Sequence, residues 1–262
     1  MTYETIRLDI ADAVATITLN RPERLNAAPP AMFDEIGAAL KSLPAAGARA
    51  VLITGAGRAF CSGADLAGRG DQSVALGEGA WRALTESFHP LMLLLAKLPL
   101  PVVAAVNGPA AGIGCSLALA ADFTIAARSA YFLQAFVNIG LVPDGGASWM
   151  LARLVGKARA TEMMLLGERI GAEKAADWGL IHKAVDDDAL QDEARALALR
   201  LANGPTLAIG LMRRGLAAAL EQGYAEAMAV EASNQRTAAD SADAREGALA
   251  FLQKRAPVFR GE

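Results

Sequence analysis

The sequence predicts a mixed α/β fold followed by a region that is almost entirely helical. In the first two-thirds of the chain, short runs with strand patterns are interspersed with runs of helical spacing. From Asp188 onward the pattern is helical to the end, with breaks at residues 203–205 and 222–223. We therefore expect a core formed by residues 1–200 and a helical appendage formed by residues 201–262.

The core elements are expected in a regular order. Phe33, Ile36 and Leu40 have the spacing of one helix face, and the short strands are apolar or alternate apolar with polar residues. The expected strands cover residues 3–10, 14–19, 50–54, 102–106, 123–127, 131–133 and 180–185. The expected core helices cover residues 30–43 and 81–97. Prolines at 99 and 101 end the second helix before the strand at 102–106.

Composition excludes several functional classes. The 262 residues carry a formal net charge of −3 and contain no basic block, which argues against nucleic acid as a partner. Cys61 and Cys115 form no CxxC pair, and the first ten residues lack the apolar segment of a signal peptide. The apolar stretches are interrupted before they could span a membrane, so we expect a cytoplasmic protein. Neither His89 nor His182 has a ligand partner at metal-site spacing.

A glycine-rich helix start follows the strand at 102–106. A dinucleotide fingerprint that began at Gly112 and Gly114 would require a third glycine at 117, which is leucine. The segment 112–114 is left with two interpretations. Its backbone N–H groups could receive developing negative charge, or its glycines could serve only close helix packing. A second candidate donor is the N–H of Ala64, in the turn that follows the strand at 50–54. An oxyanion hole requires two such donors directed at one oxygen.

An ordered set of motifs extends over nearly the whole chain, in segments 20–22, 25–27, 59–66, 106–122, 143–146, 167–170, 175–180 and 245–255. Each motif alone is weak, but the ordered set is specific. The set resembles the enoyl-CoA hydratase/isomerase (crotonase) superfamily. The resemblance implies a spiral of ββα units with a C-terminal helical region used in trimerisation. Trimers, or hexamers built as dimers of trimers, are the expected assemblies.

The resemblance also implies a site. An acyl-CoA thioester would bind with its carbonyl oxygen between the N–H groups of Ala64 and Ile113, without a metal or redox cofactor, and coenzyme A would enter as part of the substrate. The family's second donor is often glycine, so Ile113 is a mild departure. The substrate-contacting residues implied by position are Arg24, Leu25, Ala27, Ala64, Asp65, Leu66, Gly112, Phe136, Phe251 and Lys254.

Several of these residues have plainer interpretations. Arg24 and Lys254 could be solvated surface residues, Asp65 a turn or cap residue, and Phe251 a core residue. His89 could belong to the substrate pocket or be a partly buried helix residue, and the second is preferred. The segment 63–81 and the helix that carries His89 are expected to shape the acyl pocket, and the acyl group itself cannot be read from the sequence.

Two positions depart from the hydratases of this family, which use two glutamates to activate water. Ser116 and Phe136 occupy those positions here. A water between a serine and a phenyl ring has no base, so efficient hydration is not expected.

Asp144 lies where Δ3,Δ2-enoyl-CoA isomerases and phenylacetate-pathway ring-modifying isomerases carry their acid/base. Isomerisation needs one group that takes a proton from C2 and returns it to C4. A carboxyl flanked by Val142, Pro143 and Phe136 is expected to have a raised pKa suited to this transfer. The alternative is that Asp144 only caps a helix that starts near Gly145.

The favoured function is therefore an acyl-CoA isomerase that uses Asp144. Three alternatives remain open: a hydratase by family label, a hydrolase or dehalogenase in which Asp144 is the nucleophile, and a non-catalytic CoA-ester binder. The nucleophilic alternative is weakened because aryl-specific relatives pair that aspartate with a tryptophan, where this chain has Phe136.

Overall fold

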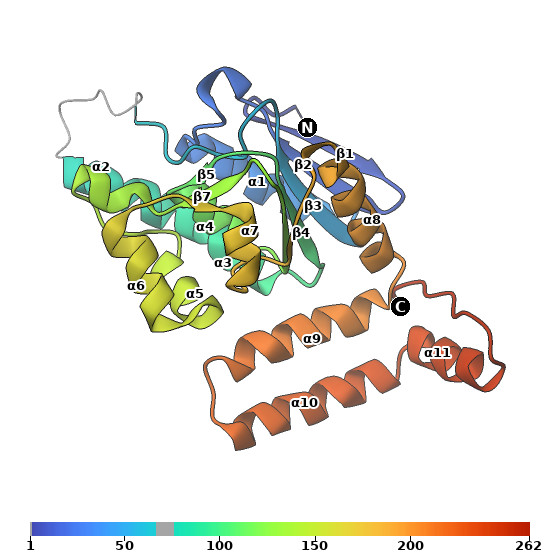
Figure 1. Cartoon of the computed structure of the whole chain (residues 1–262). Coiled ribbons are helices and arrows are strands. Elements are labelled where there is room, and N and C mark those ends of the chain that lie inside the picture. Colours follow the sequence, from blue (N-terminus) through green and yellow to red (C-terminus); the bar gives the residue numbers. More distant parts are fainter. Residues whose placement is uncertain (1, 67–75) are drawn as a thin grey trace.

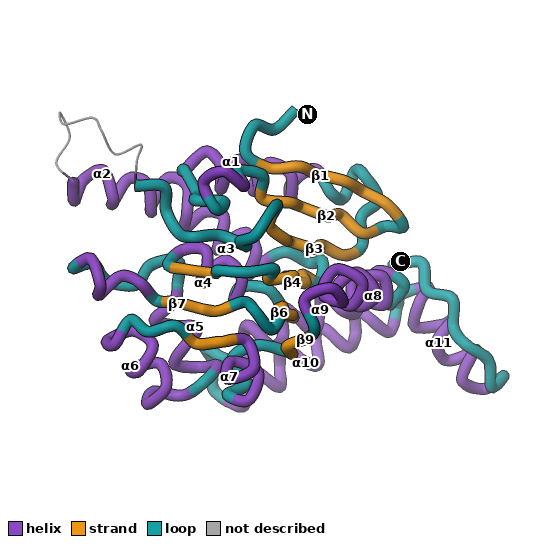
Figure 2. Tube along the Cα trace, turned by 45° about the horizontal axis from the view of Figure 1, so that its top comes forward, coloured by secondary structure: helices purple, strands orange, loops and turns teal. Residues whose placement is uncertain are grey.

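Two sheets form the core of the computed structural model, which describes residues 2–66 and 76–262. The six-stranded sheet has the order β1-β2-β3-β4-β6-β9, and Figure 2 shows its strands succeeding one another across the molecule. Its strands are β1 (Ile6–Ala11), β2 (Val14–Leu19), β3 (Ala50–Gly55), β4 (Val102–Val106), β6 (Phe123–Ala127) and β9 (Lys183–Val185). The three-stranded sheet, in the order β5-β7-β8, consists of β5 (Ala110–Ala111), β7 (Tyr131–Leu133) and β8 (Ile170–Gly171).

The pairing within the large sheet follows from its sequence patterns. β1 and β2 pair antiparallel across Asp12 and Ala13, which both have positive φ, as a tight hairpin turn requires. The later strands pair parallel, and every residue of β3 and β4 is buried. Strands covered on both faces are apolar throughout, so the prediction of buried strands at 50–54 and 102–106 is confirmed.

Two strand predictions were too long. The chain before Ile6 is not in the sheet, because the Glu35 carboxylate accepts the N–H groups of Glu4 and Thr5. Leu180 and Ile181 are buried but lie outside β9, and the Leu180 N–H donates to the Ala175 carbonyl at the end of the preceding helix. A short apolar run signals burial, which a strand and a packed turn share.

The predicted helix at 81–97 consists of three segments: α2 (Leu76–Arg82), a π-helical stretch η2 (Ala83–Phe88) and α3 (His89–Lys97). The His89 N–H donates to the Leu84 carbonyl, five residues back. Pro90 explains the wider turn, because its ring lacks an N–H and collides with the carbonyl four residues earlier in an ordinary α-helix. The other core helices are α1 (Pro30–Ser42), α4 (Ile113–Leu119), α5 (Ala147–Leu154), α6 (Gly156–Leu166), α7 (Ala172–Asp177) and α8 (Leu190–Ala202), with 3-10 turns η1 (Pro22–Arg24), η3 (Ala135–Ile139) and η4 (Asp187–Ala189).

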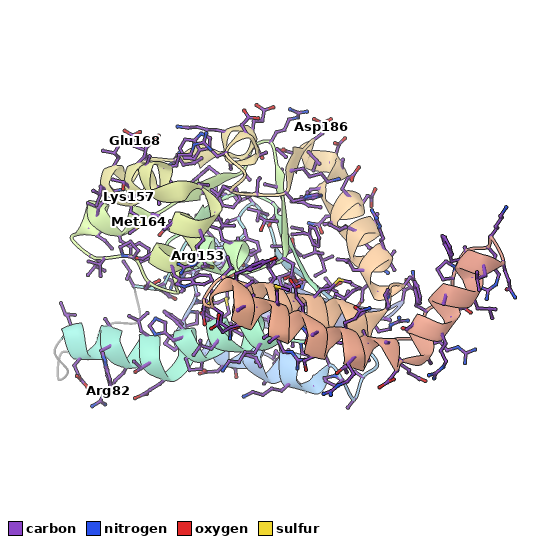
Figure 3. All side chains as sticks on the ribbon, turned by 90° about the horizontal axis from the view of Figure 1, so that it is seen from below. Arg82, Arg153, Lys157, Met164, Glu168 and Asp186 are labelled. Atoms are coloured by element: carbon purple, nitrogen blue, oxygen red, sulfur yellow. The ribbon has the colours of Figure 1, made fainter. Side chains whose placement is uncertain are left out.

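The sequence did not predict the bounds of α5, α6 and α7. In α6 only Ala160 and Met163 are buried, so the helix carries no broad apolar stripe. Figure 3 shows Arg153, Lys157 and Glu168 of this region on the outer side of the molecule, where all three are exposed.

The C-terminal helices extend away from the sheets. They are α9 (Thr206–Ala219), α10 (Tyr224–Ala239) and α11 (Ala242–Leu252), and α9 and α10 lie side by side below the core in Figure 1. Arg213 in α9 pairs with Asp122 at 2.8 Å, and Arg49 donates to the Gly204 carbonyl. These contacts attach the first helix of the appendage to the core. Within the described residues, no helix combines the length and the apolar composition needed to cross a bilayer.

Candidate functional site

The candidate site lies beyond the carboxyl ends of β3 and β4, where ligands commonly bind in parallel sheets. The segment after β3 pairs with β5: the Cys61 N–H donates to the Pro109 carbonyl at 3.0 Å and the Ala111 N–H to the Cys61 carbonyl at 2.9 Å. Gly114, in the first turn of α4, is pressed against the same segment. A Cβ on Gly114 would lie 2.5 Å from the Cys61 carbonyl oxygen, so only glycine fits there.

The N–H of Ala64 faces α4. The Ala28 N–H donates to the Gly63 carbonyl at 2.8 Å, and the Asp65 N–H donates to the Ala28 carbonyl at 2.9 Å. Ala28 therefore forms hydrogen bonds with Gly63 and Asp65, the residues on either side of Ala64. In a parallel bridge of this kind, the N–H of the middle residue, Ala64, points away from Ala28. That side is occupied by β5 and the start of α4.

The N–H of Ile113 lies beside it. Ile113 is the first residue of α4, so its N–H has no acceptor within the helix. Gly112, the N-cap, has φ +52° and ψ −127°, a conformation that only glycine adopts readily. A Cβ on Gly112 would lie 3.8 Å from the Gly63 Cα, so the two glycines that precede the two amides are in contact. The predicted donors Ala64 and Ile113 are brought to one place.

Phe136 lines this place. The same Cβ on Gly112 would lie 3.6 Å from the Phe136 ring, which is 8 % exposed. The ring is held there because the Gly112 N–H donates to the Leu133 carbonyl at the end of β7, two residues before η3 begins. An apolar ring therefore lines the place where the amides of Ala64 and Ile113 meet.

The loop that carries Asp144 lies against the first turn of α4. The Ser116 hydroxyl donates to the main-chain carbonyl of Asp144 at 3.0 Å. A Cβ on Gly145 would lie 2.4 Å from Ile113 Cδ1 and 2.9 Å from Ser116 Cβ. Half-buried Asp144 is thus next to the residue whose N–H is the second predicted donor.

Asp144 is not the N-cap residue of α5, so the alternative considered from the sequence misplaced the cap by two residues. The N-cap of α5 is Gly146, and the Asp144 main-chain carbonyl accepts the N–H of Ala147, the first helical residue.

Two residues to which the sequence assigned no role, Asn26 and Arg21, join the segment 21–27 to the segment 56–65. Buried Asn26, at φ +54°, donates to the carbonyls of Ala56 and Ala59 and accepts the N–H of Arg21. Arg21 also pairs with Asp65 at 2.8 Å. The sequence could have indicated this role for Asn26, because the asparagine side chain carries both a donor and an acceptor and asparagine tolerates a left-handed backbone.

Four of the predicted substrate-contacting residues lie in these two segments or directly after them. The Leu25 carbonyl accepts the Ser62 N–H, and the Ala27 carbonyl accepts the Arg21 guanidinium. Arg24 is exposed at the end of η1, and Leu66 is exposed beside Asp65. The pocket-shaping segment predicted at 63–81 is described only in part, since residues 67–75 lie outside the described residues.

Phe251 and Lys254 are not brought to the site by this chain. Phe251 lies in the last turn of α11 and Lys254 two residues beyond its end, and Figure 1 places α11 at the opposite end of the molecule from α2, α5 and α6. Phe251 is 84 % exposed, so the interpretation as a core residue is wrong. A contact with substrate bound near Asp144 would have to come from a neighbouring subunit.

The cysteines are structural. Burial raises the pKa of the Cys61 thiol to about 11 and that of the Cys115 thiol to about 12, so both stay protonated at neutral pH and are poor nucleophiles. His89 is half-buried at the junction of η2 and α3. Among the described residues, no group of three or more His, Cys, Asp or Glu side chains is arranged to hold a metal ion.

Comparison with known proteins identifies the family. Residues 9–262 match the family model described as enoyl-CoA hydratase/isomerase. The chain belongs to this family. A Rhodobacter capsulatus protein named "probable enoyl-CoA hydratase" is 49 % identical over 261 residues and all of both chains. The 1,2-epoxyphenylacetyl-CoA isomerase of Escherichia coli is 44 % identical over 99 % of both chains.

Solved structures support the same assignment. Enoyl-CoA hydratase from Bacillus anthracis superposes with a TM-score of 0.92 at 32 % identity, covering 99 % of this chain and 100 % of that one. The crotonase fold and membership of the enoyl-CoA hydratase/isomerase family, predicted from ordered motifs, are therefore confirmed.

Proposed function

We propose that the chain is an acyl-CoA isomerase that uses Asp144 as its single acid/base. The observation that carries the proposal is the junction of Gly145 with Ile113 and Ser116, because it fixes one carboxylate-bearing loop beside the two amides of Ala64 and Ile113. Isomerisation through an enolate requires donors that stabilise the enolate oxygen and one acid/base that transfers the proton. An oxyanion hole with one adjacent carboxylate meets both requirements.

The proposed reaction proceeds in two proton transfers. The thioester carbonyl oxygen accepts hydrogen bonds from the Ala64 and Ile113 N–H groups. The Asp144 carboxylate removes a proton from C2, and the electron pair forms a C1–C2 double bond and places negative charge on the thioester carbonyl oxygen. The resulting enolate is conjugated with the C3–C4 double bond and is therefore a dienolate. Protonated Asp144 then returns the proton to C4, and the double bond moves from C3–C4 to C2–C3. Each hole donor is worth about 3–4 kcal/mol of enolate stabilisation.

Hydration is the second candidate, because the Rhodobacter capsulatus relative carries that name. The residues argue against it. Ser116 is fully buried under Gly145, and Phe136 is nearly so, which leaves no second carboxylate to orient a water molecule. The Escherichia coli relative is named 1,2-epoxyphenylacetyl-CoA isomerase, and this name supports a ring-containing acyl-CoA ester as a substrate of the present chain.

We also propose a cytoplasmic homo-oligomer, a trimer or a dimer of trimers, assembled through the C-terminal helices. Met212 and Leu216 of α9 are each 68 % exposed, Tyr224 of α10 is 83 % exposed, and Met228 is 50 % exposed. Large apolar side chains exposed together on paired helices are typical of protein interfaces. Such an assembly supplies a route for Phe251 and Lys254 to reach a neighbour's substrate.

The deciding experiment replaces the acid. Asp144→Asn should lower double-bond migration by roughly 10²–10⁴-fold, because the amide cannot accept the C2 proton, while CoA-ester binding stays nearly unchanged. The assay follows 2-enoyl, 3-enoyl and ring-containing CoA esters in deuterated water and records double-bond position, deuterium uptake, water addition and CoA release. Exposed Asp188 supplies the matched control, Asp188→Asn. Full turnover by Asp144→Asn, or water addition as the main reaction of the wild type, contradicts the proposal.

A further inference from the structure

Ser116 stands where the hydratases have a water-activating glutamate, and its hydroxyl has a different partner. Fully buried, it donates to the Asp144 carbonyl at 3.0 Å and lies 3.4 Å from the Gly112 carbonyl. The Gly112 carbonyl already accepts the Ser116 backbone N–H at 3.1 Å. A hydroxyl has one proton to donate, and the Asp144 carbonyl is the nearer of its two possible acceptors. The hydrogen bond to Asp144 therefore depends on the Ser116 side chain, whereas the Gly112 carbonyl keeps its bond from the Ser116 backbone N–H.

The same turn of α4 carries the second predicted oxyanion donor. Ile113 and Ser116 are three residues apart and therefore lie on one face of the helix. Both contact Gly145, the residue after Asp144. The N–H of Ile113 and the main chain of the acid are thus tied to one another through a single helical turn, all of whose residues are buried.

The acid loop needs such an anchor because its own sequence does not fix it. Gly140, Gly145 and Gly146 all have positive φ, and glycine has the widest choice of backbone conformations. The Asp144 carbonyl also accepts the Ala147 N–H at 3.1 Å, but that bond closes a local turn and does not tie the loop to the core. The Ser116 hydroxyl supplies the hydrogen bond between the loop and α4.

We propose that Ser116 is a positioning residue whose hydroxyl sets the place of Asp144 relative to the Ile113 N–H. The inference rests on the proposed function. It assigns to the former glutamate position a new task, which is to hold the single acid instead of activating water. A displacement of about 1 Å in a catalytic group can cost on the order of 100-fold in rate. The loss of the hydrogen bond that positions Asp144 should therefore lower the rate of isomerisation.

The test compares Ser116→Ala and Ser116→Cys with wild type. Ser116→Ala should lower kcat for isomerisation roughly 10- to 100-fold and leave KM within about 2-fold, because the acid is misplaced while the CoA ester still binds. Ser116→Cys keeps a weak donor and should fall between the two. Ser42→Ala is the matched control, since Ser42 donates to the Ala39 carbonyl within α1. Wild-type kcat in Ser116→Ala, or equal changes in kcat and KM, overturns the inference.

A second measurement is independent of turnover. Backbone amide hydrogen exchange of the peptide spanning residues 141–150 should be several-fold faster in Ser116→Ala than in wild type, and unchanged in Ser42→Ala. Unchanged exchange at 141–150 in Ser116→Ala shows that the hydroxyl is not the anchor. If Asp144→Asn keeps full turnover, the proposed function fails, and the exchange result still decides whether Ser116 holds the loop.

Discussion

Helices α4 and α10 have opposite relations to the rest of the chain. All seven residues of α4 are buried, whereas none of the sixteen residues of α10 is. The α4 sequence contains isoleucine and glycine at its start and has weak intrinsic helix propensity, so packing must hold it in place. The α10 sequence is rich in alanine and needs less support from packing.

The two helices differ in what holds them in place. The place of α4, and with it the N–H of Ile113 and the hydroxyl of Ser116, is fixed by contacts inside one chain. The exposed apolar side chains of α9 and α10 have no comparable cover in this chain, so the proposed assembly would supply it. Changes in the first region should damage chemistry directly, and changes in the second should act through assembly.

Within the two regions compared, the largest effect is expected at Gly114. Gly114→Ala places a Cβ 2.5 Å from the Cys61 carbonyl, which must push α4 away from the segment that carries the Ala64 N–H. We expect a loss of about 1–3 kcal/mol in the free energy of unfolding and roughly 100-fold in kcat. Chemical denaturation and steady-state kinetics measure the two effects.

Gly37→Ala is the control for this prediction. Gly37 also lies in a helix, α1, but a Cβ there would meet nothing within 4 Å. Alanine should raise the free energy of unfolding by about 0.5–1 kcal/mol and leave kcat unchanged. Equal stability changes of the same sign in the two variants would show that the contact between α4 and Cys61 is not tight.

An intermediate effect is expected on the exposed face of α9. Leu216→Asp removes about 2 kcal/mol of apolar burial from each proposed interface and adds a charge, so the assembly should dissociate to folded subunits. Light scattering after size exclusion measures the mass. The exposed residue Gln235, changed to Glu, controls for added charge. An unchanged mass for Leu216→Asp would remove α9 from the interface.

The smallest effect is expected at the tail that follows α11. Arg255 and the Val258 N–H hold the pKa of Glu246 at about 2, below its usual 4.5. Because the folded pKa is lowered, this stabilisation is complete above pH 4.5 and is lost as the pH falls through about 2. Proteolysis of the tail by pepsin should therefore increase between pH 4 and pH 2. Glu246→Gln should show a weaker pH dependence, and an identical increase in that variant would contradict the assignment.

The sequence predicted the strands at 102–106, 123–127 and 131–133 with their observed bounds, because each apolar run is followed by a polar or charged residue: Asn107, Arg128 and Gln134. It predicted a single helix at 81–97, because periodicity does not reveal that Pro90 forces a π-helical stretch. It did not predict the bounds of α5, α6 and α7; in α6 only two residues are buried, so the sequence shows no apolar stripe.

The candidate site divides in the same way. Ala64, Ile113 and Asp144 were selected from their positions in ordered motifs, and the structure brings the three segments together. The roles of Asn26 and Ser116 were not selected, because both act through hydrogen bonds to main-chain carbonyls from distant segments. A pattern of residue types does not record which carbonyl a buried side chain meets.

By itself, the sequence determined the fold family and which residue types stand at the proposed reacting positions: a carboxylate at 144, and no glutamate at 116 or 136. Local patterns and ordered motifs are properties of the chain, so they need no coordinates. Only the tertiary structure decided that Gly145 rests on Ile113 and Ser116, that the N-cap of α5 is Gly146 and not Asp144, and that α11, which carries Phe251, lies at the opposite end of the molecule from α2, α5 and α6. These facts depend on contacts between residues distant in the sequence, and close packing fixes such contacts only when the whole core has formed.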